Sequence, residues 1–186
     1  ALRQKGLKVS VGLEFVNYTD QKYVNQYRGG TLAEDQFLTA IKWSGISFDF
    51  YKQQLNFPLL GRGESSLGLN LPRSVTSKLS KGGLGALAPE DTALMPPNFT
   101  LGRDSYKARF MEAAGAHCPV PDYCFIAQCA WDDTMAWQAV NFISTHPDQV
   151  LVVVVGEFHV QFGGGIKYRI QQRLPGAEVA TLSQVW

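Results

Sequence analysis

Residues 150–155 read Val-Leu-Val-Val-Val-Val, a run with no polar side chain on either face. Such a strand is typical of a parallel sheet that helices cover on both sides, because both of its faces must be buried. The run continues directly into Gly156, Glu157, Phe158 and His159. Ligands bind beyond the carboxyl ends of the strands in open parallel sheets, so the sequence predicts a site at Glu157 and His159. The alternative is a simple turn followed by a loop histidine.

Apolar segments alternate with helical or loop segments along the chain, and this alternation indicates the fold class. Five are predicted as strands: Val9–Glu14, Leu67–Asn70, Cys124–Gln128, Val150–Val155 and Glu178–Leu182. The alternation predicts an α/β protein, a three-layer α/β/α arrangement with a mainly parallel sheet. We expect residues 1–186 to form a single domain, with a small helical lobe over residues 20–56.

Helix signals fill the intervals between these strands. Thr31 and Glu34 have the spacing of a capping box, which predicts a helix from residue 32 to Trp43. Asp132 or Asp133 is expected to cap another helix. Two shorter helices are predicted over residues 72–79 and 109–116, on either side of a Gly- and Pro-rich connection at 82–104.

Polar residues stand where the predicted strands end. Glu14 ends the first, Asn70 the second and Gln128 the third, and Glu157 and His159 follow the fourth. The carboxyl ends of parallel strands share one edge of a sheet, so we expect these side chains to line one pocket. A glutamate beside a histidine can bind a metal, move a proton or orient a ligand. The alternative for Glu14 is a carboxylate that caps backbone N–H groups.

The composition and charge of the chain limit the classes of binding partner that we expect. The chain has 186 residues, of which 45% are hydrophobic and 18% charged, and its formal net charge is +1. Its 17 Lys and Arg form no basic stripe, so the sequence implies neither a nucleic acid nor an anionic membrane as partner. There is no Gly-x-Ser-x-Gly motif, and the run Gly163–Gly165 follows no strand as a phosphate-binding loop would.

Three cysteines leave two alternatives open. Cys118 and Cys124 enclose a short segment with two prolines, which favours a disulfide in an oxidising compartment and leaves Cys129 free. The alternative is three reduced thiols in a cytosolic protein, with Cys129 buried as a small apolar residue.

Four segments, read in order, resemble the ChaN family of haem-binding, iron-regulated bacterial lipoproteins. They are Val11–Phe15, Asn70–Arg73, Ala127–Ala136 and Gly156–Val160. The resemblance implies an α/β/α fold, a role in haem and iron acquisition together with other uptake components, an outer-membrane location and a homodimer that forms around haem.

In that family a tyrosine ligates the haem iron, while histidine and lysine from the partner protomer hold the propionates. The resemblance therefore implies one tyrosine ligand among the seven present and suggests a set of haem-binding candidates. The set consists of Tyr51, Tyr106, Lys107, His117 and His159. The pocket expected beside it consists of Glu14, Asn70, Arg73, Gln128, Asp132 and Glu157.

The chain departs from the family at its start. The family's first strand carries a Gly-Glu-x-His motif, and the residues before Val9 supply neither that motif nor a cysteine for a lipid. We expect this first strand to be missing, together with residues near 61–66, and membrane attachment to depend on a lipid anchor absent from this chain.

A hydrolase is the rival interpretation. The wider superfamily, marked by a Gly-x-x-His motif, includes metal-dependent and acid–base hydrolases. In such an enzyme Glu14 or Glu157 would be the base and His159 a metal ligand or acid. A third alternative is a structural domain in which the polar residues only cap strands.

Overall fold

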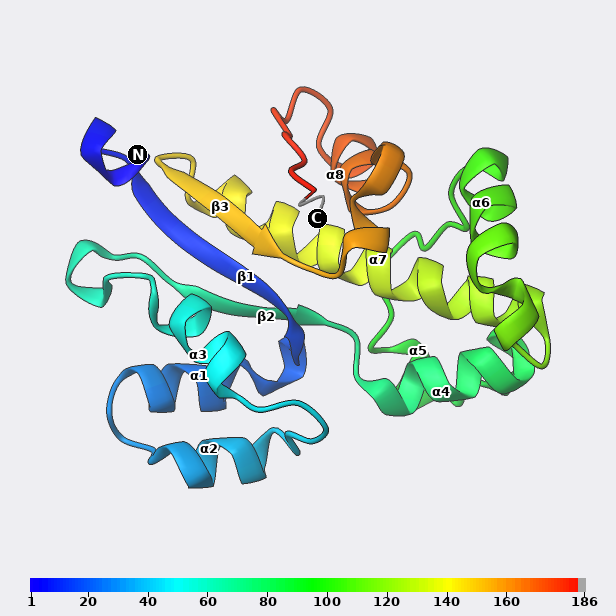
Figure 1. Ribbon diagram of the computed structural model, residues 1–186, viewed down its shortest axis with the longest axis horizontal. Coiled ribbons are helices and arrows are strands. Elements are labelled where there is room, and N and C mark those ends of the chain that lie inside the picture. Colours follow the sequence, from blue (N-terminus) through cyan, green and yellow to red (C-terminus); the bar gives the residue numbers. More distant parts are fainter. Residues whose placement is uncertain (184–186) are drawn as a thin grey trace. The chain divides into compact units, whose positions relative to one another are not determined.

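The computed structural model describes residues 1–183, which divide into two compact units (Figure 1). The first unit comprises Ala1–Asn70 and Asn141–Val155. The second comprises Leu71–Val140 and the residues from Gly156 on.

A three-stranded parallel sheet forms the centre of the first unit. Strand β1 (Lys8–Asn17) lies between β2 (Ser66–Asn70) and β3 (Gln149–Val154), in the order β2-β1-β3. Both neighbours run parallel to β1. The α/β fold class with a parallel sheet is therefore confirmed, and it is consistent with the predicted three-layer arrangement.

Close packing between β1 and β2 depends on Gly68. A Cβ atom on Gly68 would lie 2.4 Å from the carbonyl oxygen of Asn17, so a side chain at this position would force the strands apart. The register shifts between Leu13 and Asn17, where β1 continues past the predicted strand end at Glu14. Glu14 is therefore inside β1 and does not terminate it, contrary to the prediction.

Three helices form the predicted lobe over residues 20–56. They are α1 (Gln21–Arg28), α2 (Glu34–Ala40) and α3 (Asp49–Asn56), and they gather on one side of the sheet (Figure 1). Their buried side chains pack against β1 in one hydrophobic cluster, formed by Val11, Leu13, Val16, Val24, Phe37, Phe48 and Leu55. Each fully buried side chain of this size contributes roughly 1.5–3 kcal/mol of transfer free energy.

The start of α2 differs from the predicted capping box. The backbone N–H of Ala33 donates to Gln36 Oε1 at 3.2 Å, so the box is formed by residues 33 and 36. The hydroxyl of Thr31 instead donates to the carbonyl of Gln26. Helix α2 ends at Ala40, three residues before Trp43.

The second unit is helical and is organised around one long helix, α7 (Pro121–Thr145), whose last residues belong to the first unit. The other helices are α4 (Arg73–Gly82), α5 (Pro89–Thr92), α6 (Asp104–Ala114) and α8 (Ile166–Arg173). No helix within residues 1–183 combines the length and the apolar character needed to cross a bilayer.

Two predicted strands are wrong. Cys124–Gln128 lies inside α7, because its apolar run of four residues fits a buried helix as well as a strand. Asp132 and Asp133, expected as caps, are consequently inside the same helix and buried. Glu178–Leu182 has no regular secondary structure, and Leu182 is 93% exposed.

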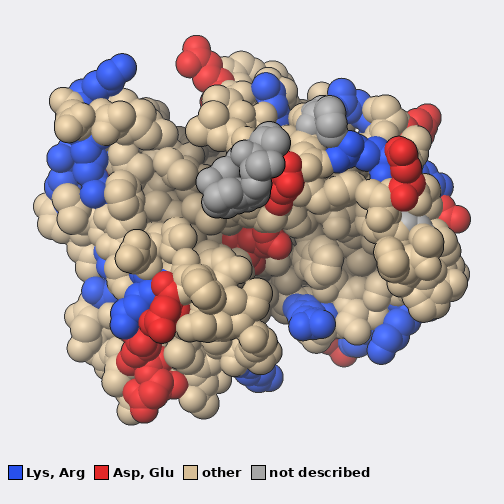
Figure 2. Space-filling model, in the orientation of Figure 1, with Lys and Arg blue, Asp and Glu red and all other residues tan. Residues whose placement is uncertain are grey.

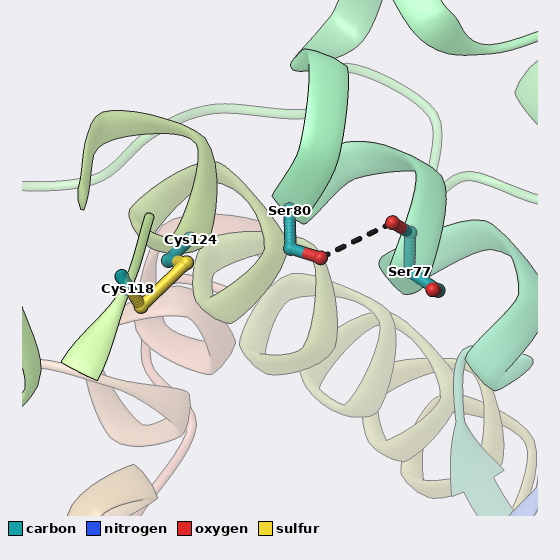
Figure 3. Close-up of a disulfide and its surroundings, with 4 residues drawn as sticks. All are labelled: Ser77, Ser80, Cys118 and Cys124. Carbon is teal, nitrogen blue, oxygen red and sulfur yellow. Dashed lines mark hydrogen bonds between the residues drawn. A yellow bond between two sulfur atoms is a disulfide. The ribbon is translucent and has the colours of Figure 1, made fainter. Parts of the chain in front are cut away.

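A disulfide joins Cys118 to Cys124 at the start of α7, close to Ser77 and Ser80 of α4 (Figure 3). Cys129 is a buried free thiol. Burial raises the pKa of this thiol to about 12, although the nearby Arg169 guanidinium opposes the shift. A loop this short contributes ~2 kcal/mol in the chain-entropy account of disulfides.

Thiol counting tests this cysteine arrangement. We expect no thiol to react with a disulfide reagent in the native protein at pH 8 and one to react after denaturation without reductant, because Cys129 is protonated and buried. Cys129→Ala should remove the denatured-state signal. Three reactive thiols after denaturation would contradict the disulfide.

Glu64, just before β2, is a buried carboxylate. Arg3 Nη2 donates to its Oε2 at 2.5 Å, and the backbone N–H of Leu59 donates to the same oxygen at 2.8 Å. Burial alone would raise the pKa of Glu64, but these bonds and one from the Val9 backbone outweigh it and lower the pKa to about 2.

The depressed pKa of Glu64 makes stability depend on pH. Its stabilising contribution is complete above the unfolded pKa of about 4.5 and is lost as the pH falls through about 2. Glu64→Gln should lower the free energy of unfolding at pH 7 by about 1–3 kcal/mol and flatten its decline between pH 4.5 and 2. Urea unfolding across this range measures both effects, with exposed Glu90→Gln as control. Equal pH profiles for wild type and Glu64→Gln would refute the assignment.

Candidate functional site

Four polar side chains converge inside the second unit. Tyr106 comes from α6, Gln128 and Asp132 from α7, and His159 from the 3-10 turn Glu157–His159. Their exposed fractions are 2%, 8%, 0% and 7%, so the group is buried. Gln128 and Asp132 are four residues apart on a helix, which places both on the same face.

The carboxylate of Asp132 lies at the centre of this group. Tyr106 Oη donates to Asp132 Oδ2 at 2.6 Å, and His159 Nδ1 is 2.6 Å from Asp132 Oδ1. An ionised carboxylate only accepts hydrogen bonds, so Nδ1 of His159 carries the proton. Each carboxylate oxygen therefore binds a donor from a different element.

This proton placement fixes the histidine tautomer. Gln128 Nε2 is 3.1 Å from His159 Nδ1 and 3.2 Å from Tyr106 Oη. Because Nδ1 already holds a proton, the amide donates to Tyr106 Oη instead. In a neutral ring the lone pair is then on Nε2, which is the nitrogen that can accept a proton or bind a metal.

Two glycines allow the chain to pack against the network. A Cβ on Gly165 would lie 2.3 Å from the carbonyl oxygen of His159 and 3.2 Å from Asp132 Oδ1. A Cβ on Gly164 would lie 2.7 Å from the ring of Tyr106. The run Gly163–Gly165 therefore serves packing and not phosphate binding.

Aromatic rings and an arginine surround the same network. The ring centroid of Phe158 is 5.6 Å from that of Tyr106, and the guanidinium of Arg109 is 5.4 Å from the centroid of Phe158. Arg109 also donates to the Gln161 side chain.

Glu157, a predicted site residue, is exposed and accepts a hydrogen bond from Ser183 at 2.6 Å. That bond, together with Gln161 and the charge of Arg109, lowers the pKa of Glu157.

A second charged group lies beside the first on α7. Arg173 donates to both oxygens of Asp133 at 2.8 Å, and Arg169 Nη1 is 3.7 Å from Asp133 Oδ1. Arg169 is 1% exposed and donates to the carbonyl of Thr100 at 2.8 Å. This ion-pair group anchors α8 and the segment before α6, and sequence reasoning missed it. Two adjacent acids in an apolar stretch, with two arginines four residues apart, were the available signal.

The other predicted site residues are distributed over both units. Glu14 in β1, Asn70 at the end of β2 and Tyr51 in α3 belong to the first unit. A pocket shared by Glu14, Asn70 and His159 stays a prediction. Gln128 does contact His159, but from a helix and not from a strand end.

Three predicted residues lie outside the network at exposed positions of the second unit. Arg73 is the first residue of α4, and His117 is in the turn Gly115–His117. Lys107 of α6 forms an exposed ion pair with Asp122, with Nζ 2.6 Å from Oδ1. Within the described residues, no three His, Cys, Asp or Glu side chains are grouped to hold a metal.

Comparison with known families decides the class of protein. A family model described as "Haem-binding uptake, Tiki superfamily, ChaN" matches residues 1–170. The chain belongs to the ChaN family. No curated protein sequence matches it.

A solved structure supports the ChaN fold. The chain is similar to a solved structure of ChaN from Campylobacter jejuni, described as "Cofacial heme binding to ChaN of Campylobacter jejuni". The TM-score is 0.62 and the sequence identity is 20%. The match covers 91% of this chain and 65% of that one. The chain therefore spans somewhat less than two thirds of that ChaN structure, and at this identity the likeness shows the fold alone.

The Asp132 network predicts that Tyr106 resists ionisation. Burial, followed by the negative charge of Asp132, raises the pKa of the Tyr106 hydroxyl far above its ordinary value of 10. In an absorbance titration at alkaline pH, we expect Tyr106 to ionise last, together with unfolding. Tyr106→Phe should remove that late phase and destabilise the protein by about 1–3 kcal/mol, since Asp132 loses a buried donor. A full tyrosine titration below the unfolding pH would contradict this.

Proposed function

We propose that this chain binds haem and acts in haem and iron acquisition. The observation that carries the proposal is the ChaN family match over residues 1–170. Haem, when bound, supplies a ferric iron that takes axial ligands and an apolar macrocycle with two carboxylates. The chain's own residues must then provide a ligand and an apolar surface.

Tyr106 does not fit the ligand role in this arrangement. Its hydroxyl is buried and donates to Asp132 at 2.6 Å, and its raised pKa disfavours the phenolate that ferric iron requires. Ligation by Tyr106 would break this bond and leave the Asp132 carboxylate without one of its buried donors, which is costly.

Tyr51 fits the ligand role better, because it lies in an apolar and partly exposed setting. Its ring packs against Phe15 at 4.4 Å and Trp43 at 5.5 Å, measured between ring centroids. The neighbouring residues Ile46 and Phe50 are 56% and 70% exposed. Among residues 1–183, the Tyr51 hydroxyl has no hydrogen-bond partner, so a bond to iron would displace none.

The exposed position of this surface supports a haem-induced homodimer. One protomer can cover one face of the macrocycle through Ile46, Phe50 and Tyr51, and the other face would remain in water. A second protomer that presents the same surface would bury that face, which favours a two-fold dimer around haem. As an extension of this proposal, we infer that the protein is a lipoprotein of the bacterial outer membrane. Lys107 and His117 are the candidate residues that would hold the haem propionates.

Hemin titration tests the proposal. Wild type should give a Soret shift with a high-spin ferric spectrum, and Tyr51→Phe should weaken hemin binding at least about tenfold through loss of a ligand bond. Tyr168→Phe, which alters another partly exposed tyrosine, is the matched control. Sedimentation of wild type with hemin should show a dimer. No Soret shift in wild type would refute haem binding, and an unchanged Tyr51→Phe would refute the ligand.

The Asp132–His159 pair favours a second function, acid–base hydrolysis. A carboxylate that holds the Nδ1 proton of a histidine orients Nε2 as a base, as in hydrolytic triads. His159→Gln should then abolish hydrolysis of an activated ester such as p-nitrophenyl acetate, while Tyr51→Phe should not. Equal rates in wild type and His159→Gln would exclude this role.

A further inference from the structure

The Asp132–His159 pair is closed to solvent in this structure. Asp132 is 0% exposed and His159 is 7% exposed, so little of either side chain is open to a substrate. An acid–base role for the pair therefore requires that some segment of the second unit moves aside. Helix α6 contributes one residue, Tyr106, to the buried network, and this helix is the candidate for the movement.

Two aromatic rings hold α6 against the rest of the second unit. Among the 11 residues of α6, the buried side chains are those of Tyr106 and Phe110. Their ring centroids lie 6.0 and 5.5 Å from that of Phe125, and 5.6 and 6.1 Å from that of Phe158. A helix with so few buried apolar side chains can open locally while the rest of the protein stays folded.

The outer face of α6 is polar and solvent-exposed. Figure 2 shows basic and acidic side chains together at the position that α6 occupies in Figure 1. Lys107 on this face pairs with the exposed Asp122, and an exposed ion pair of this kind contributes little stability. The surface contacts therefore do not prevent α6 from moving.

A glycine suited to act as a hinge precedes α6. Gly102 has a φ of +77°, in the left-handed region that other residues rarely adopt. The two residues before it are fixed by their carbonyl groups. Arg169 Nη1 donates to Thr100 at 2.8 Å, and Cys129 Sγ donates to Leu101 at 3.1 Å. The chain is anchored up to Leu101, so a rotation about Gly102 moves α6 without disturbing α7 or α8.

The hydrogen bond from Tyr106 to Asp132 fastens α6 over the buried pair. It measures 2.6 Å and joins the helix to the carboxylate at the centre of the network. When α6 moves away, water that enters can replace the phenol as a donor to the carboxylate. Opening therefore exchanges one donor for another and does not leave a buried charge unpaired.

We propose that α6 is a lid, which rotates about Gly102 and controls access to the Asp132–His159 pair. The lid is closed in this structure and is held by Tyr106. In the open state a small substrate or reagent reaches His159. The gating role rests on the proposed acid–base hydrolysis, whereas the movement of α6 depends neither on that function nor on haem binding.

Chemical modification of the histidines measures the opening of the lid. Diethyl pyrocarbonate modifies accessible neutral imidazole rings, and peptide mass spectrometry follows each histidine separately. In wild type, His159 should react at least about tenfold more slowly than the exposed His117, which is an internal reference. Tyr106→Phe should accelerate the reaction of His159 about tenfold relative to His117, because the closed state loses a hydrogen bond to a charged group.

Two further variants separate opening from other effects. Gly102→Ala leaves the Asp132 network unchanged but strains the closed lid, so it should also accelerate the reaction of His159. This variant also covers the case in which Tyr106→Phe does not fold. Val75→Ala is the matched control, because Val75 is fully buried in α4 and lies outside the cluster around Tyr106. It should destabilise the protein and leave the ratio of the two histidine rates unchanged.

Three results would overturn the proposal. The first is a wild-type His159 that reacts as fast as His117. The second is an unchanged rate at His159 in folded Tyr106→Phe and Gly102→Ala, with folding checked by near-ultraviolet circular dichroism. The third is an equal acceleration by Val75→Ala, which would assign the reaction to global unfolding. The measurement needs no hydrolytic activity, so an inactive protein with a mobile α6 would refute the hydrolysis and not the lid.

Discussion

One buried carboxylate, that of Asp132, determines the arrangement of the second unit. It is fully buried and is bonded at 2.6 Å by a tyrosine from α6 and by a histidine from the turn that follows β3 in the chain. A buried charge without such donors would cost several kcal/mol, so α6, α7 and this turn can pack only in an arrangement that brings both donors to Asp132. The contacts at Gly164 and Gly165 follow from the same requirement, because any side chain there would collide with the network.

The same hydrogen bond argues against Tyr106 as the ligand of the haem iron. A phenol that donates to a buried carboxylate is kept protonated, and a protonated phenol is a poor ligand for ferric iron. The proposed ligand, Tyr51 on the helical lobe, has a different setting, because its ring is partly exposed and packs against Phe15 and Trp43. The buried Asp132–His159 pair is the feature on which the second proposed function, acid–base hydrolysis, depends.

The sequence predicts the class of fold well and the individual elements unevenly. The run Val150–Val155 and the segment Val9–Glu14 predict parallel strands, and the residues between Asp20 and Asn56 predict the helical lobe, because periodicity and composition act locally. Cys124–Gln128 was misassigned because its apolar side chains are buried in a helix, and only the tertiary environment distinguishes the two cases. Sequence reasoning expected Gln128 to lie near His159, and the two residues do contact each other, but it placed Gln128 at the end of a strand where the chain is helical. It had no means of assigning Tyr106 to Asp132, 26 residues away.

Resonance Raman spectroscopy of the hemin complex tests the assignment of the iron ligand most directly, since it detects the vibrations of an iron-bound phenolate. We expect these bands in wild type and in Tyr106→Phe, and we expect them to disappear in Tyr51→Phe. Bands that persist in Tyr51→Phe and disappear in Tyr106→Phe would contradict the assignment, because the phenol held by Asp132 would then be the ligand.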